Sequence, residues 1–265
     1  MDGRTEGGLR KWVSESKLPP QERSILLWST MYKRFKQYEH RWYKRLEFLL
    51  RSFYFRKTTK EWFDFIKNME REEMHRFMLI PHRSFYDTRL TSEERVFVAK
   101  KHLSRKLKNT AIAGIDLKNG KRLLIGITET TNYSEGLKDI KIVYEQEVIY
   151  NFTFTLVDYM LFIGNAQAAS DEAKHKLKFL TKQLDGIQPK FLLMAALREF
   201  AKLNGVLKIE GVSTKYHPRR KKLKINYDEL WEEFGGDKIP LNGNYVIPLN
   251  VKRRDISEYP SNKRA

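Results

Sequence analysis

Residues 148–156 read Val-Ile-Tyr-Asn-Phe-Thr-Phe-Thr-Leu, a stretch in which large apolar and polar side chains alternate. Successive side chains of an extended strand point to opposite faces, so this alternation predicts a β-strand with one apolar and one polar face. The apolar face is expected to carry Val148, Tyr150, Phe152, Phe154 and Leu156, and the polar face Asn151, Thr153 and Thr155. The second half of the chain should therefore be built on a sheet.

Further strands are predicted on both sides of this one. Residues 111–116 and 122–127 flank Asn119-Gly120, the preferred dipeptide of a tight β-hairpin, and residues 140–144 and 159–163 are also rich in β-branched and aromatic side chains. Connections this short join antiparallel neighbours, so an antiparallel meander is expected.

The pattern then changes to helix. Residues 171–183 and 189–203 have helical spacing of their apolar positions, and an apolar strand follows at 206–213. A strand that returns after two helices is expected to lie parallel to an earlier strand. A short helix at 227–233 and a strand at 245–249 complete this region.

The N-terminal part is predicted to be helical. Residues 24–56 contain no Gly or Pro and repeat apolar residues every three or four positions, a second helix is expected over 59–69, and Thr91 with Glu94 has the spacing of a capping box. The expected fold is α+β, with an N-terminal helical layer on a mixed, mainly antiparallel sheet flanked by helices. The expected divisions are a flexible N-terminus (1–22), a helical region (23–108) and a mixed-sheet α+β domain (109–265).

The composition favours an anionic partner. Lys and Arg number 51 against 33 Asp and Glu, giving a formal net charge of +18. Nucleic acid, acidic lipid or a phosphorylated ligand would be attracted, although a solvated basic surface gives the same composition. The absence of cysteine excludes disulfides, thiolate metal sites and a cysteine nucleophile, and the histidines have no metal-ligand spacing. Without a signal peptide or a long apolar run the chain is expected to be cytoplasmic, and its oligomeric state is left open.

A ligand pocket is predicted where two strands end. If strand 206–213 lies parallel to strand 159–163, both carboxyl ends open at one edge of the sheet, where such folds bind ligands. That edge would bring together the small-residue segment 164–170, expected to be a loop, and His217. The expected ligand-binding residues are Gln167, Ser170, Ser213 and Tyr216.

Two kinds of chemistry are open at this edge. His217 is a candidate general base with Glu199 as a second catalytic candidate, and the alternative is a surface histidine in a turn. The cluster that follows is the densest positive run of the chain and is a candidate anion-binding site: Arg219, Arg220, Lys221 and Lys222.

Several motifs of the C-terminal third resemble the VirK/YbjX family of bacterial proteins. They are Gln188-Pro189-Lys190, Ala196-Leu197-Arg198-Glu199, Gly211-Val212-Ser213 with His217, residues 227–236 with their Tyr-Asp, Leu-Trp and Gly-Gly pairs, Ile247-Pro248-Leu249, and residues 258–265. The resemblance extends from about residue 75 to the C-terminus. It implies a role in virulence and in resistance to antimicrobial peptides through the cell envelope, and it supplies no reaction.

The order of elements also resembles the GNAT acyltransferases. In those enzymes a strand, a small-residue loop and a helix precede a parallel strand, and the loop binds the pyrophosphate of acyl-coenzyme A. Here Gln167 is followed three and five residues later by Ser170 and Glu172, which departs from the small residues of their loop. The resemblance implies a GNAT-like acyltransferase using acyl-CoA or an acyl carrier, peripheral to the inner membrane. The alternative is a non-catalytic basic protein that binds nucleic acid or anionic lipid.

Overall fold

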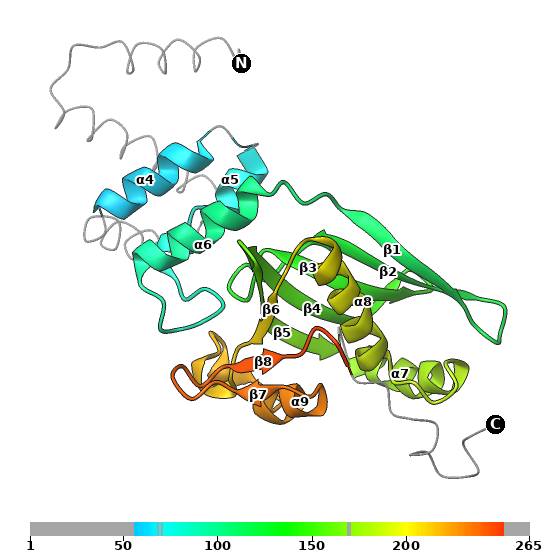
Figure 1. Cartoon of the computed structure of the whole chain (residues 1–265). Coiled ribbons are helices and arrows are strands. Elements are labelled where there is room, and N and C mark those ends of the chain that lie inside the picture. Colours follow the sequence, from blue (N-terminus) through cyan, green and yellow to red (C-terminus); the bar gives the residue numbers. More distant parts are fainter. Residues whose placement is uncertain (1–55, 68, 70, 169–170, 252–265) are drawn as a thin grey trace, which may run out of the picture. The chain divides into compact units, whose positions relative to one another are not determined.

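The computed structural model in Figure 1 describes residues 56–67, 69, 71–168 and 171–251. The chain divides into two units, residues 1–82 and 83–265. The helix expected over 24–56 falls almost wholly outside the described residues, as do the closing segment 258–265 and Ser170. The flexible segment 1–22 and a domain boundary at residue 108 remain predictions.

The described part of the first unit is helical. It comprises α4 (Arg56–Ile66), α5 (Arg71–Phe77) and the 3-10 turn η1 (Ile80–His82). Trp62, Ile66 and Met74 are almost completely buried, and the Trp62 Nε1 donates a hydrogen bond of 2.9 Å to the carbonyl of Phe77. Aromatic burial together with this bond holds the two short helices against one another.

The second unit contains an eight-stranded mixed sheet. Five strands form the predicted antiparallel meander: β1 (Thr110–Asp116), β2 (Arg122–Glu129), β3 (Lys138–Tyr144), β4 (Glu147–Val157) and β5 (Met160–Ala168). The remaining three are β6 (Lys208–Gly211), β7 (Asp237–Lys238) and β8 (Tyr245–Ile247), in the order β5-β6-β8-β7. β6 is parallel to β5 and β8 is antiparallel to β6, so the mixed, mainly antiparallel α+β fold is confirmed.

Four helices accompany the sheet in the described part of this unit. They are α6 (Ser92–Ser104), α7 (Asp171–Gln183), α8 (Pro189–Leu203) and α9 (Tyr227–Glu233). The predicted capping box is present, because Thr91 accepts a bond from the Glu94 backbone and Glu94 accepts one from the Thr91 backbone. The 3-10 turns η2 (Thr214–Tyr216) and η3 (Arg220–Lys222) lie between β6 and α9.

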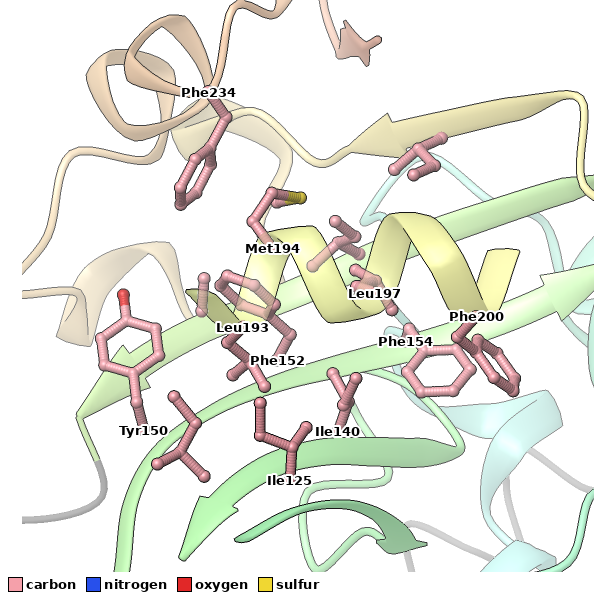
Figure 2. Packing of buried hydrophobic residues seen from close by; sticks show 14 of the residues in the cluster. Ile125, Ile140, Tyr150, Phe152, Phe154, Leu193, Met194, Leu197, Phe200 and Phe234 are labelled. Carbon is pink, nitrogen blue, oxygen red and sulfur yellow. The ribbon is translucent and has the colours of Figure 1, made fainter. Parts of the chain in front are cut away.

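The main hydrophobic core lies between α8 and the sheet. Figure 2 shows Leu193 and Leu197 of α8 on the side of Phe152 and Phe154 of β4, whereas Met194 extends from the opposite side of the helix within the same core. All five side chains are fully buried. Burial of each such side chain contributes about 1.5–3 kcal/mol to stability, so this contact fixes α8 across the strands β3 and β4.

The alternation predicted for residues 148–156 is correct except at its start. Four of the five apolar residues are in the core, but Val148 is only half-buried and Ile149 enters the core instead. The reason is a β-bulge: Tyr150 pairs with Ile142 and Val148 with Val143, which leaves Ile149 as an extra residue. The polar set forms the opposite face and is buried rather than solvated: Asn151, Thr153 and Thr155.

The segment 164–170 was expected to be a loop, and this is wrong through Ala168. β5 continues to that residue, pairing from Asn165 opposite Thr153 to Ala168 opposite Tyr150. β4 is long enough to supply backbone partners for these residues, so the segment stays in the sheet. A second bulge, at Gly164, keeps β4 and β5 paired on either side of it.

A methyl group at Gly211 tests the packing of α9 on β6. The Cβ of Gly211→Ala would lie 2.6 Å from the Trp231 indole, which is fully buried and donates from Nε1 to the Val212 carbonyl. Burial and this hydrogen bond both prevent the ring from moving aside. We therefore expect the substitution to lower the free energy of unfolding by about 1–3 kcal/mol, measured by urea denaturation. Leu241→Ala, at a fully exposed position, is the control and should change it by less than about 0.5 kcal/mol. Unchanged stability of Gly211→Ala would contradict this packing.

Candidate functional site

The predicted junction of two parallel strands is present. Residues Met160–Ile163 of β5 pair with Lys208–Gly211 of β6, and the next amide, that of Val212, donates to the Ile163 carbonyl. Beyond this point β5 runs on while the chain after β6 turns into η2. The strands therefore diverge at the carboxyl ends, which is where ligands bind in open sheets.

Beyond Ile163, β5 has no strand partner on the β6 side, and two side chains form hydrogen bonds with its backbone instead. The Nε2 of His217 donates to the Gly164 carbonyl over 2.7 Å, and the Tyr227 hydroxyl accepts a bond of 3.1 Å from the Ala166 amide. The two rings stack on each other with centroids 4.9 Å apart. The predicted approach of His217 to the segment that begins at Gly164 is thus observed.

His217 is buried and both of its ring nitrogens are engaged. Nε2 carries the proton given to Gly164, and Nδ1 accepts a 3.0 Å bond from the Arg219 amide. Burial lowers the pKa of His217 to about 4, against the opposing effect of the bond to Gly164. The alternative of a surface histidine does not hold, since the ring is completely inaccessible. The role of general base stays a prediction, and in this arrangement neither nitrogen is open to a substrate.

The other predicted residues are only partly brought together. Ser213 is buried, its amide donates to Asn244, and its hydroxyl has no hydrogen-bond partner in the described chain. Tyr216 is half-buried under the Arg89 guanidinium, 3.7 Å from the ring centroid, and Gln167 is half-buried on β5. Glu199 is exposed on α8 and forms an ion pair with Lys202, so no contact in the described chain joins it to His217.

A buried carboxyl that sequence reasoning missed lies beside this junction. Glu135 follows β2 and is 3% exposed, and its carbonyl is so close to Gly164 that a Cβ there would lie 1.8 Å from it. Its Oε1 is 3.3 Å from Arg219 Nε, and its Oε2 has no hydrogen-bond partner in the described chain. Burial raises the pKa of Glu135 to about 7, with Asp139 adding to this and Arg219 opposing it.

A row of buried polar side chains crosses the sheet next to Glu135. Thr153 donates to Asp139 over 2.7 Å and accepts from Asn165 over 3.3 Å, and Asn165 accepts a 2.8 Å bond from the Tyr227 hydroxyl. Each of these side chains is almost completely buried. Buried polar groups are costly unless satisfied, so such a row indicates either precise positioning or chemistry.

The carboxyl of Glu135 is a candidate for proton exchange. A carboxyl whose pKa lies near neutrality exchanges protons readily at physiological pH, and perturbed carboxyls gather at functional sites. Glu135 combines that pKa with an oxygen atom that no described group satisfies. The sequence around it, residues 130–137, has neither helical nor strand periodicity, so no pattern marks it before the fold is known.

The predicted anion-binding cluster is divided by the structure. Arg219 meets Glu135 and donates to Asn132, whereas Arg220, Lys221 and Lys222 are exposed on η3. These three have no acidic partner among the residues that the structure describes. They are the part of the cluster that is open to an anion.

Comparison with known proteins shows the family. Residues 37–265 match the family described as "Protein of unknown function (DUF535)". The chain belongs to this family. That membership confirms the resemblance to VirK/YbjX proteins, and it establishes no activity.

Three relatives of this DUF535 protein have names that describe no activity. The chain is 30% identical to "Uncharacterized protein YbjX" of Escherichia coli over 169 residues, which is 58% of this chain and 51% of that protein. Two uncharacterized proteins of Haemophilus influenzae are 29% identical over 125 residues and 30% over 127, each match covering 45% of this chain and 41% or 42% of the relative. The chain spans about half or less of the relatives it matches, and no solved structure matches it.

Among the residues that the structure describes, no helix is both long enough and apolar enough to cross a bilayer. No group of three or more His, Asp or Glu side chains among them is arranged to hold a metal ion.

Replacing Glu135 should change how stability depends on pH. In the folded chain the pKa of Glu135 is raised from 4.5 to about 7, so the folded state holds this proton more tightly than the unfolded state. The stabilisation is full below about pH 4.5 and is lost as the pH rises through about 7. The side chain introduced by Glu135→Gln cannot ionise, so the free energy of unfolding of this variant should not show this fall with pH. In the parent the fall is on the order of 3 kcal/mol, from about 1.4 kcal/mol for each unit of pKa difference.

Urea denaturation of both proteins at several pH values between 5 and 8 measures the effect. Glu147→Gln, at an exposed carboxylate paired with Lys176, is the matched control and should follow the parent. The same fall in stability for the parent and Glu135→Gln would show that Glu135 ionises at an ordinary pH.

Proposed function

We propose that this DUF535 protein is an acyltransferase in which Glu135 is the general base. The observation that carries the proposal is the buried carboxyl of Glu135, with its pKa near 7, beside the diverging ends of β5 and β6. The order β5-α7-α8-β6, with β6 parallel to β5, supports it because GNAT acyltransferases have this order of elements. His217 then acts by position: it holds the free edge of β5 through Gly164.

The reaction balances with one residue as the proton carrier. Glu135 takes the proton from an acceptor amine or hydroxyl, whose nitrogen or oxygen forms a bond to the acyl carbon. The thioester bond of acyl-CoA or an acyl carrier breaks, and the proton passes from Glu135 to the departing thiolate. Gln167, Ser170, Ser213 and Tyr216 stay the proposed contacts to the donor, whereas Glu199, exposed on α8 and paired with Lys202, has no part in this proton path.

The donor's phosphates are the weakest fit. Asp171 and Glu172 are the first two residues of α7, where they would repel a pyrophosphate. An acyl carrier, which presents its thioester on a single phosphodiester arm, meets less of this repulsion. The proposed acceptor is a component of the cell envelope, in keeping with the roles in virulence and antimicrobial-peptide resistance that the VirK/YbjX resemblance implies.

Thiol release measures the proposed activity directly. The chain has no cysteine, so a thiol reagent detects only thiol freed from acetyl-CoA, palmitoyl-CoA or palmitoyl-carrier protein, with a bacterial envelope lipid extract as acceptor. Glu135→Gln should lower the rate by roughly 10²–10⁴-fold and remove the rise of the rate through pH 7.

The exposed control Glu147→Gln should keep both. If no donor releases thiol and none raises the melting temperature, acyl transfer is wrong. If Glu135→Gln keeps the parent's rate and pH profile, another residue is the base.

A second function, in a different class, is supported by the basic turn. Arg220, Lys221 and Lys222 are exposed and without acidic partners in the described chain. They can therefore bind an anion without first breaking an ion pair. We propose acidic lipid as that anion, which would hold the protein at the inner membrane. Nucleic acid is the alternative that the test separates.

Vesicle binding distinguishes the two anions. The parent should bind phosphatidylglycerol vesicles at low salt and lose affinity steeply as salt is added. Arg220→Glu combined with Lys221→Glu and Lys222→Glu should lose at least about tenfold, since each basic residue near an acidic surface is worth about 1 kcal/mol. Stronger binding of a polynucleotide than of these vesicles would favour nucleic acid. Absence of both at low salt would leave the turn as a solvated surface.

A further inference from the structure

An open depression of about 460 Å³ lies between α7 and the start of α8, on the opposite side of β4 from the buried polar row. Its lining is mainly apolar, and its volume falls within the range of about 300–1,000 Å³ common for small-molecule sites. The lining residues are Tyr150, Leu177, Lys178, Thr181, Lys182, Gln188, Pro189 and Lys190.

Positive charge surrounds this apolar surface. Lys178 and Lys182 are one helical turn apart on α7, both are exposed, and neither has an acidic partner in the described chain. Lys190, on the α8 side, forms an ion pair with Glu233. Three ammonium groups against one carboxylate leave the rim with an excess of positive charge.

The first turn of α8 adds one backbone donor, the amide of Lys190, at the same place. α8 has 15 residues, and its N-cap residue Gln188 makes no side-chain capping bond. Pro189 occupies the first turn, so the next free amide is that of Lys190. A helix N-terminus without a side-chain cap favours an anion.

The hydroxyl of Tyr150 is a hydrogen-bond donor that the described chain leaves open to a ligand. Tyr150 is 6% exposed, and its hydroxyl has no hydrogen-bond partner among the described residues. Figure 2 shows Tyr150 at one end of the labelled core side chains, and Tyr150 lines the depression. Burial and the nearby Glu233 raise the pKa of Tyr150, so the group remains a donor throughout the physiological range.

We propose that this depression binds a single-chain anionic lipid, an aliphatic chain with a phosphate head. The chain covers Leu177, Pro189 and the ring of Tyr150, and the head meets Lys178, Lys182 and the Tyr150 hydroxyl. Both parts of this ligand are needed to account for the lining. A phosphate alone would leave the apolar wall without a role, and an uncharged chain alone would leave the lysines without one. Two large apolar side chains flank the N-terminus of α8 in sequence and are exposed, Ile187 and Phe191, which extends the surface available to a chain.

The site is separate from the proposed acyl transfer and from the basic turn. Its residues come from β4, α7 and the start of α8, whereas Glu135, His217 and Arg220–Lys222 come from other segments. Binding can therefore be tested without a donor, an acceptor or vesicles, and its failure leaves those proposals unaffected.

Calorimetric titration with octyl phosphate below its micelle concentration tests the site on the full chain. We expect saturable binding of one molecule. Lys178→Glu combined with Lys182→Glu should weaken binding at least tenfold, and Thr181→Trp, which places an indole in the depression without changing charge, should weaken it as well. Tyr150→Phe should weaken binding about tenfold, as for a lost hydrogen bond to a charged group, and leave the melting temperature unchanged because the hydroxyl has no partner to lose.

Lys106→Glu combined with Lys108→Glu is the matched control, since both residues are exposed, unpaired in the described chain and outside the depression. It carries the same change in net charge and should bind as the parent does. Equal weakening by the two double variants would reduce the effect to overall charge and overturn the site. Equally tight binding of inorganic phosphate or octyltrimethylammonium, or no saturable binding, would overturn it too, and unchanged binding by Tyr150→Phe would contradict the position of the head group.

Discussion

The four-residue parallel pairing of β5 with β6 is the constraint on which the candidate active site depends. Because β6 stops at Gly211 while β5 continues to Ala168, the backbone groups of β5 beyond Ile163 lose a strand partner on that side. Unpaired buried backbone groups are costly, and His217 and Tyr227 satisfy them from the chain that follows β6. The same divergence that opens the sheet edge thus dictates which side chains must lie there.

The two faces of the sheet serve different purposes. The face toward α8 is apolar and close-packed, with Phe152 and Phe154 fully buried, and it supplies the hydrophobic stabilisation. The opposite face buries Asp139, Thr153 and Asn165 and relies on hydrogen bonds among them. An apolar row would stabilise a fold at lower risk, since a partly satisfied network costs more than it contributes. Retaining polar groups and an unsatisfied Glu135 oxygen there is consistent with a site that acts on a ligand.

Features that arise from residues close together in sequence could be predicted, whereas features that depend on residues far apart in sequence could not. The alternation of residues 150–156, the Asn119-Gly120 turn and the Thr91–Glu94 capping box are local patterns, and each is present as predicted. The bulges at Ile149 and Gly164 were not predicted, because a bulge is defined by the partner strand and not by its own sequence. Glu135 was missed for a related reason: its burial and its pKa come from Gly164, Arg219 and Asp139, which are distant in sequence or carry no pattern with it.

Arg219 links the parts that the sequence presented as one basic run. Its backbone amide donates to His217, which fixes the turn after η2, while its guanidinium meets Glu135. The positive guanidinium lowers the pKa of Glu135 and so favours its charged form, against the burial that favours the neutral form. Proton uptake by Glu135 weakens this contact without disturbing the backbone bond to His217. Arg219 therefore connects the exposed cations Arg220–Lys222 to the candidate active site. The strength of its contact with Glu135 depends on whether Glu135 is protonated.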